Sequence, residues 1–116
     1  MSLLKTIATS ALGDGVVSKI APDRLLEGDP TCTTWEQDAI EGKVETGVWQ
    51  MTPGKNISVK SNIYEFCHIL EGVIELTEDG KEPVTYRAGD SFVMKPGFVG
   101  TWKTVETVRK IYVIID

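Results

Sequence analysis

The chain has 116 residues, of which 41% are hydrophobic and 25% are charged. This size and composition suit one domain with one hydrophobic core, and they exclude a disordered chain. The net charge of −5 disfavours nucleic acid as a partner, because contacts with phosphates need a basic surface. No apolar run approaches the roughly 20 residues of a membrane-spanning helix, so we expect no membrane association.

The cysteine content and the first residues bear on location. Cys32 and Cys67 lie far apart and form no CxxC motif. The opening stretch, MSLLKTIATSALGDGVV, has only a broken apolar segment and is a poor secretory signal. Two unpaired thiols in an acidic chain without a leader fit a reducing compartment, so we expect a cytoplasmic protein without a disulfide.

The first part of the chain gives weak structural signals. Residues 1–20 have no clear period, and residues 21–43 are rich in Asp, Glu, Pro and Gly. We predict an extended N-terminal arm over 1–43, with turns and a short strand at 24–26. The arm packs on, or swaps with, a barrel domain formed by 44–116.

From residue 44 onward the pattern is typical of β-structure. Aromatic and β-branched residues alternate with polar ones, and Gly, Pro and Asp separate the runs, with a hairpin turn at Asp79-Gly80. Many short strands with almost no helical period predict an all-β antiparallel sandwich or barrel. The predicted strands are 44–51, 56–61, 63–70, 73–77, 83–88, 100–105 and 109–116. A further short strand is predicted between the Gly turns of 89–97.

Two segments have a more specific pattern. They are 54–72, GKNISVKSNIYEFCHILEG, and 89–102, GDSFVMKPGFVGTW. With RLLEGDPTCTTW, GVWQMTPG and VRKIYV in the same order, they resemble the small single-domain cupins related to ureidoglycine aminohydrolase, within the cupin superfamily. The resemblance covers residues 24–113 and implies a cupin-like antiparallel β-barrel of the jelly-roll type.

The resemblance also implies where a site would lie. Metal-binding cupins take ligands from a His-x-His pair, a following Glu and a His in the second motif. The Glu falls at Glu65, the His pair at Ser58 and Lys60, and the last His near Gly100. One carboxylate cannot hold a transition metal, which wants three or four donors. We therefore expect no metal and no cofactor.

Lys60 stands where the resemblance places a metal-binding histidine. An ammonium beside Glu65 would lower the cost of burying the carboxylate and would anchor a small polar ligand. On this hypothesis Glu65 is a catalytic acid or base, and Lys60 and Ser58 bind the ligand. In the alternative, Lys60 reaches solvent and Glu65 bonds to backbone or water.

Other residues around this segment can each be interpreted in two ways, as part of a ligand site or as structural. Cys67 shares a strand face with Glu65, so it is either a ligand-binding residue or a buried, inert thiol, whereas His68 faces the other way. Trp102 is expected to face the interior, as a wall for a ligand or as filling. Phe98, after a turn, either closes over a ligand or packs on a strand.

The last strand begins with two basic residues. Arg109 and Lys110 follow Glu106 closely, and a surface ion pair explains them at least as well as a function does.

Three functions remain open on the sequence. The first is an enzyme acting on a small polar metabolite, and the named relative, a manganese-dependent amidohydrolase, implies amide, ureido or carboxylate compounds. The absent histidines put that metal chemistry in doubt. The alternatives are a non-catalytic module that binds a small molecule and a structural oligomerisation domain with a filled barrel. The resemblance, together with apolar arm residues that need covering, predicts a homodimer.

Overall fold

The computed structural model describes residues 2–116, and the regular elements found there are all β-strands. No helix in this range is long and apolar enough to cross a membrane. The strands are β1 Val16–Lys19, β2 Leu25–Glu27, β3 Thr31–Ile40, β4 Val44–Met51, β5 Gly54–Val59, β6 Tyr64–Glu78, β7 Val84–Arg87, β8 Ser91–Met94 and β9 Val99–Ile115. The all-β expectation is confirmed.

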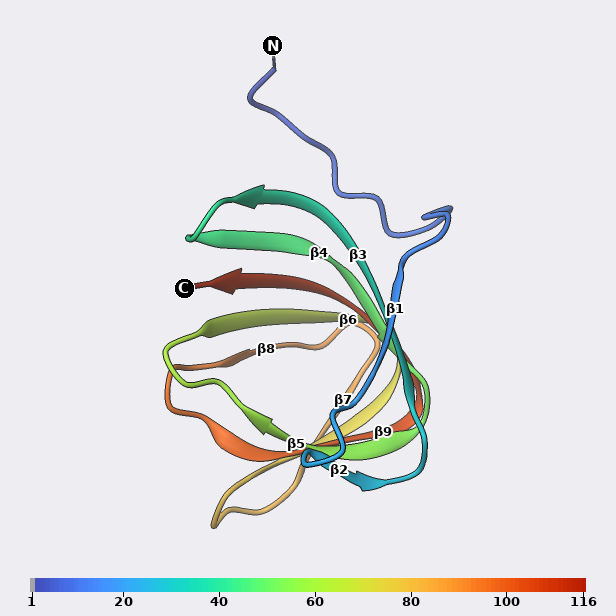
Figure 1. Cartoon of the computed structure of the whole chain (residues 1–116), viewed down its shortest axis with the longest axis vertical. Helices are drawn as coiled ribbons and strands as arrows, with labels where there is room; N and C mark the ends of the chain where they lie inside the picture. Colours follow the sequence, from blue (N-terminus) through green and yellow to red (C-terminus); the bar gives the residue numbers. More distant parts are fainter. Residues whose placement is uncertain (1) are drawn as a thin grey trace.

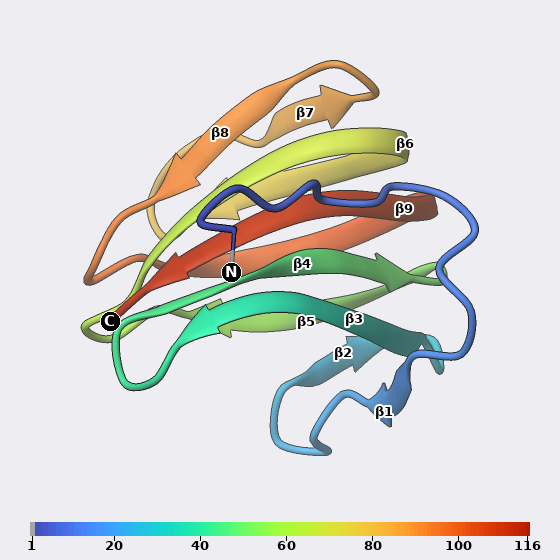
Figure 2. The ribbon, with the colours of Figure 1, turned by 90° about the horizontal axis from the view of Figure 1, so that it is seen from above.

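Every pairing is antiparallel, and two long strands join the two layers of the barrel. The sheet runs β1-β3-β4-β9-β5-β2, and β6 pairs with β7, β8 and β9. The first part of β9 pairs with β5, and its last part pairs with β4. Because β9 and β6 bend together from one layer to the other, the sheet curls around an interior (Figure 1), with β8, β6, β9 and β4 following one another across the upper layer (Figure 2).

The bend of β6 depends on Gly72. The pairing of β6 with β9 shifts register between Ile69 and Ile74. Gly72 has φ 94°, and a Cβ on it would lie 2.2 Å from the backbone oxygen of Thr107. The stretches 63–70 and 73–77, predicted as two strands, are therefore one strand that bulges at a glycine. The stretches 100–105 and 109–116 likewise form one strand, β9.

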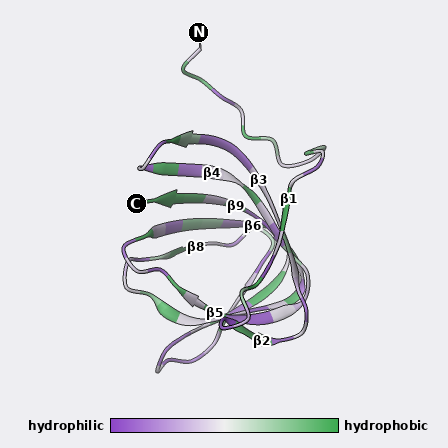
Figure 3. Ribbon diagram, viewed as in Figure 1, coloured by the Kyte–Doolittle hydropathy of each residue, from purple (hydrophilic) through white to green (hydrophobic). Residues whose placement is uncertain are grey.

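The core lies between the layers. Buried residues alternate with exposed or half-buried ones along much of β6, β8 and β9. The strands carry both hydrophobic and hydrophilic residues (Figure 3). The buried hydrophobic cluster includes Met51, Ile69, Ile74, Phe92, Trp102 and Val108. Three polar or charged residues are buried among them: Glu65, Thr104 and Lys110. A buried charge needs partners, so this cluster marks a candidate site.

The N-terminal region contributes strands of its own. The short strand expected at 24–26 is β2, but the sequence pattern does not predict β3, whose TCTTWEQDAI has few hydrophobic residues. β3 pairs along β4. Before β1, the chain follows the outer side of β3, where the Gln37 amide forms two hydrogen bonds of 2.7 Å with the backbone of Ala8. Exchange of residues 1–43 with a second copy stays a prediction.

Candidate functional site

Glu65 lies inside the barrel between two lysines. Its carboxylate is almost inaccessible, since the residue is 4% exposed. Lys60 Nζ lies 2.8 Å from Oε1, and Lys110 Nζ lies 2.7 Å from Oε2. Each oxygen therefore accepts a charge-assisted hydrogen bond from a different ammonium, and the expected Lys60–Glu65 ion pair is present.

Three separate elements hold this cluster. Glu65 is near the start of β6, where it is paired with Met94 of β8 and Ile114 of β9. Lys60 follows β5, and its backbone N–H donates to the Phe98 oxygen at 3.0 Å. Lys110 reaches in from β9, 45 positions after Glu65. The pairing of β6 with β9 and the short connection from β5 to β6 bring the three charges together.

The charges of the cluster reinforce one another. Burial alone would raise the pKa of Glu65, but attraction to Lys110 and Lys60 and their hydrogen bonds outweigh it and lower that pKa to about 2. Burial would lower the pKa of Lys110, yet its contacts with Cys67 and Glu65 raise it above its ordinary value. Glu65 is thus ionised at neutral pH, and Lys110 is protonated.

Lys110 also lies in an aromatic corner. The Trp49 and Trp102 rings meet edge to face, with centroids 5.5 Å apart. Lys110 Nζ lies 4.4 Å from the Trp49 centroid and 4.5 Å from the Trp102 centroid. The ring faces attract the cation and compensate for part of the water it has lost. Trp102 faces the interior, as the sequence predicts.

Cys67 is hydrogen-bonded to the cluster but does not line the cavity that opens beside it. Its thiol donates to Glu65 Oε2 at 3.2 Å, and the residue is fully buried. Burial, assisted by the adjacent Glu65 carboxylate, raises the pKa of the thiol to about 12. Cys67 is therefore a neutral thiol at physiological pH, which makes it a poor nucleophile. His68 points the other way and contacts Ser91 Oγ at 2.8 Å.

A cavity of about 340 Å³ opens beside the ion cluster. Ser58, Lys60, Glu65 and Trp102, all singled out from the sequence, line it together. Asn56 lines it too, and its buried side-chain oxygen has no hydrogen-bond partner within residues 2–116. Phe98 is not in this group, because it lines a different cavity. The roles predicted for these residues, catalytic or ligand-binding, stay predictions.

Sequence reasoning missed the second lysine. The surface ion pair proposed for Lys110 is wrong, because Lys110 is 6% exposed and bonds to Glu65. Arg109 contacts Gln50 and Glu71 rather than Glu106. A signal was available, because residues of the same parity as Trp102 face inward along β9, including Lys110. Treating 100–105 and 109–116 as separate strands concealed it. No comparable pattern in the sequence indicated that Trp49 and Asn56 lie at the site.

The residues present do not fit the metal of the metal-binding cupins. Within residues 2–116, no three His, Cys, Asp or Glu side chains are grouped to hold an ion. The positions implied for histidines carry Ser58, Lys60 and Gly100, and a Cβ at Gly100 would lie 2.2 Å from the Thr77 oxygen. Two ammonium groups also occupy both oxygens of Glu65 and would repel a cation. The cluster replaces metal–ligand bonds with ion pairs.

The curled antiparallel barrel is the fold of the cupin class. The model of the EutQ-like cupin domain matches residues 39–112, and the chain belongs to this family. Comparison with curated proteins gives no match.

Several solved structures share the fold. A protein of unknown function of the DUF861 family from Pseudomonas syringae pv. tomato is 23% identical, with a TM-score of 0.74 over 93% of this chain and 46% of that one. The Clostridium difficile EutQ protein is 17% identical, with a TM-score of 0.65 over 74% of this chain and 63% of its own. A predicted oxalate decarboxylase from Thermotoga maritima is 16% identical, with a TM-score of 0.67 over 96% of this chain and 98% of that one.

These likenesses show the fold alone, and they confirm the predicted cupin-like barrel. The chain spans less than two thirds of the C. difficile and P. syringae proteins, at 63% and 46% of their lengths. The functions in the names of the similar structures differ from one another, so they assign no activity to this chain.

Proposed function

We propose that the cavity beside Glu65 binds a small carboxylate that also carries an amide or ureido group. The observation that supports it most is the pair of ammonium groups, Lys60 and Lys110, at one small cavity. Each ammonium has three N–H donors. One donor from each reaches Glu65. The Lys110 ammonium also contacts the Trp49 and Trp102 rings, so the donors that can receive an anionic ligand come mainly from Lys60.

Burial makes these donors effective. Lys60 has 17% of its side chain exposed and faces the cavity, whereas Lys110 is almost wholly enclosed. An anion that enters such a site exchanges water for fixed charges in surroundings of low dielectric constant. Two cations face one carboxylate at the buried cluster, whereas Glu45, the other acidic residue that lines the cavity, is exposed to solvent. The buried charges therefore favour a carboxylate over an amine.

Asn56 supports the second part of the proposal. Its unpartnered side-chain oxygen is a buried acceptor, which is costly unless a donor meets it. An N–H of an amide or ureido group would satisfy it. The resemblance of the two sequence motifs to ureidoglycine aminohydrolase points to the same compounds.

Thermal unfolding of the full chain tests the proposal. A ligand that binds only the folded state raises the Tm by mass action. We expect N-carbamoylglycine at millimolar concentration to raise the Tm by a few degrees. Its amide, which lacks the carboxylate, and acetate, which lacks the ureido group, should have smaller effects.

Variants distinguish binding at this site from a general effect of added salt on the Tm. Lys60→Met should abolish the shift, and Asn56→Ala should remove the preference for N-carbamoylglycine over acetate. Lys103→Met, an exposed lysine on β9, is the matched control and should keep the full response. If no compound of this class shifts the Tm, or if Lys60→Met responds like the control, the proposal is wrong.

Catalysis by Glu65 is a second candidate. With a pKa of about 2, Glu65 at rest is a weak base and holds no proton to donate. A ligand carboxylate that attracts Lys60 away would remove one of its two cations and raise that pKa. Turnover of the bound compound that Glu65→Gln abolishes, while binding persists, would establish this candidate. Binding without turnover would indicate a non-catalytic binding module instead.

A further inference from the structure

A second and larger cavity lies between the edge strands. It has a volume of about 560 Å³ and is bordered by β7, β8, the end of β6 and the turn at 95–98. Of its lining residues only Met94 also lines the cavity beside Glu65. The volume falls within the range of small-molecule sites in proteins, roughly 300–1,000 Å³. It is therefore a separate site candidate.

The topology explains why the space is open. Within residues 2–116, β7 and β8 each pair only with β6. No ladder of backbone hydrogen bonds joins them, although they follow one another in the chain. The gap between the two edges is closed by side chains alone, so a small molecule can enter without breaking strand pairing.

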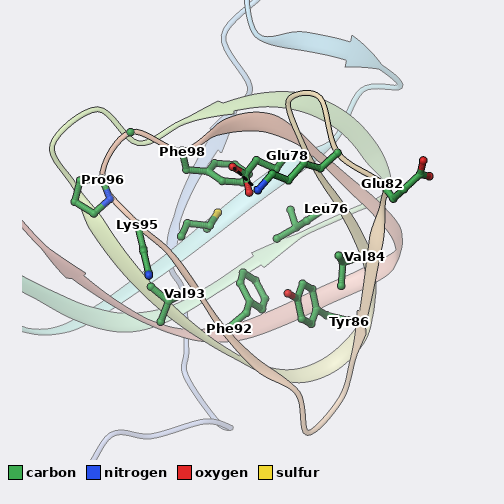
Figure 4. Close-up of a pocket in the computed structure, with 13 residues that line it drawn as sticks. Leu76, Glu78, Glu82, Val84, Tyr86, Phe92, Val93, Lys95, Pro96 and Phe98 are labelled. Atoms are coloured by element: carbon green, nitrogen blue, oxygen red, sulfur yellow. Dashed lines mark ion pairs between the residues drawn. The ribbon is translucent and has the colours of Figure 1, made fainter.

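The walls are aromatic and aliphatic. Tyr86 and Phe92 stack with centroids 4.3 Å apart and planes inclined by 23°. Figure 4 shows these two rings on one side of the cavity, the Phe98 ring on the other, and Leu76 and Val84 between them. Val84 is 48% exposed, so apolar surface faces the opening. Facing aromatic walls of this kind favour a flat ring system.

The charges at this cavity differ from those beside Glu65. Glu78 and Glu82 are balanced by Lys81 and Lys95, and all four residues are exposed. Glu78 and Lys81 are also paired with each other, at 3.9 Å. Solvated, balanced charges give no net attraction for an ion. A ligand here gains from apolar contact rather than from charge.

We propose that this second cavity binds a neutral, ring-containing apolar molecule between Phe98 and the stacked Tyr86–Phe92 pair. The site is independent of the carboxylate site around Glu65. Two cavities of opposite chemistry in one small barrel would let the chain hold a polar and an apolar ligand at once.

Titration with N-phenyl-1-naphthylamine, an uncharged dye that brightens in apolar surroundings, tests the proposal on the full chain. We expect saturable binding with one site per chain. Val84→Trp fills the cavity and should weaken binding roughly tenfold or more. Its control is Thr85→Trp, the neighbouring residue on β7 that does not line the cavity.

A second pair of variants covers the case in which Val84→Trp fails to fold. Phe98→Ala removes one wall and should also weaken dye binding. Phe66→Ala, at a half-buried phenylalanine that does not line the cavity, should leave dye binding unchanged. Absence of saturable binding overturns the proposal, as does equal binding by the cavity variants and their controls.

One further outcome would also overturn it. If the wild-type chain binds no dye and Val84→Trp converts a dimer into a monomer in light scattering, the cavity is covered by a second copy rather than by a small molecule.

Discussion

Lys110 on β9 donates to Glu65 on the neighbouring strand β6 at 2.7 Å, and both residues are almost wholly enclosed. Together with Lys60 on the other carboxylate oxygen, this bond makes a buried charge cluster a structural part of the fold as well as its candidate site. Removing one partner of a buried ion pair leaves a charge without compensation, and this usually costs more than the pair itself contributes.

The stability of the Lys110→Met variant measures that cost. We expect a loss of about 3 kcal/mol in the free energy of unfolding, determined by urea denaturation, because Glu65 keeps only Lys60. The double variant Glu65→Leu/Lys110→Met should recover much of the loss, since it removes both buried charges. Lys103→Met, exposed on the same strand, is the control. A loss no greater than that of the control would contradict the buried pairing.

The acid stability of the chain should depend on Glu65. Its pKa falls from an ordinary 4.5 to about 2 in the folded state, so the folded state favours the ionised carboxylate. The resulting stabilisation is complete above pH 4.5 and is lost as the pH falls to about 2. Urea denaturation of the wild type over this range should therefore show a decline that Glu65→Gln lacks. Parallel pH curves for the two proteins would exclude Glu65 as its source.

Local patterns predicted the strands of the barrel better than they predicted its bends. The alternation in 44–51 gives β4, and Asp79-Gly80 marks the turn between β6 and β7. The bulge at Gly72 and the continuity of β9 could not be read in the same way, because they depend on contacts between distant residues. A bulge looks like the end of a strand in the sequence, since both interrupt the alternation.

The same limit applies to the site. Glu65 and Lys60 are five residues apart, so their pairing could be predicted from one motif. Lys110 joins them only through the closure of β9 against β6, and its neighbour Arg109 made the pair look like a surface charge. The unpartnered oxygen of Asn56 has no sequence signature at all, because it reflects what the surrounding side chains leave unsatisfied.

The two cysteines should be unreactive in the folded protein. Cys32 and Cys67 are buried, and burial raises the pKa of both thiols. Since the thiolate is the reactive form, iodoacetamide at pH 8 should add no mass to the native chain and two adducts to the urea-unfolded chain. Rapid modification of one thiol in the native protein would show that the cluster around Cys67 opens, or that Cys32 is accessible.

The homodimer predicted from the sequence can be tested through the N-terminal arm. Leu3 and Leu4 are 100% and 87% exposed, and such apolar residues gain from burial against a second copy. We expect light scattering to give the mass of a dimer at micromolar concentration. Leu3→Glu/Leu4→Glu should shift the equilibrium towards the monomer. A wild-type monomer would contradict the dimer, and an unchanged dimer in the variant would exclude these leucines from the interface.

Gly72 provides the sharpest test of the bend that shapes the barrel. Gly72→Ala must tolerate a positive φ and also a contact of 2.2 Å with the Thr107 oxygen, so we expect a loss of roughly 3 kcal/mol or more. Gly80→Ala is the matched control, because Gly80 also has a positive φ, 79°, but has nothing within 4 Å of its added Cβ. It should cost only about 1 kcal/mol.

The difference between the two glycine variants isolates the close approach of β6 to β9, since the strain of a positive φ is common to both. Equal losses in urea denaturation would mean that the bulge can relax and that backbone contact at Gly72 does not fix the bend. A larger loss for Gly72→Ala, without a change in the m-value, would show that this contact stabilises the native barrel itself.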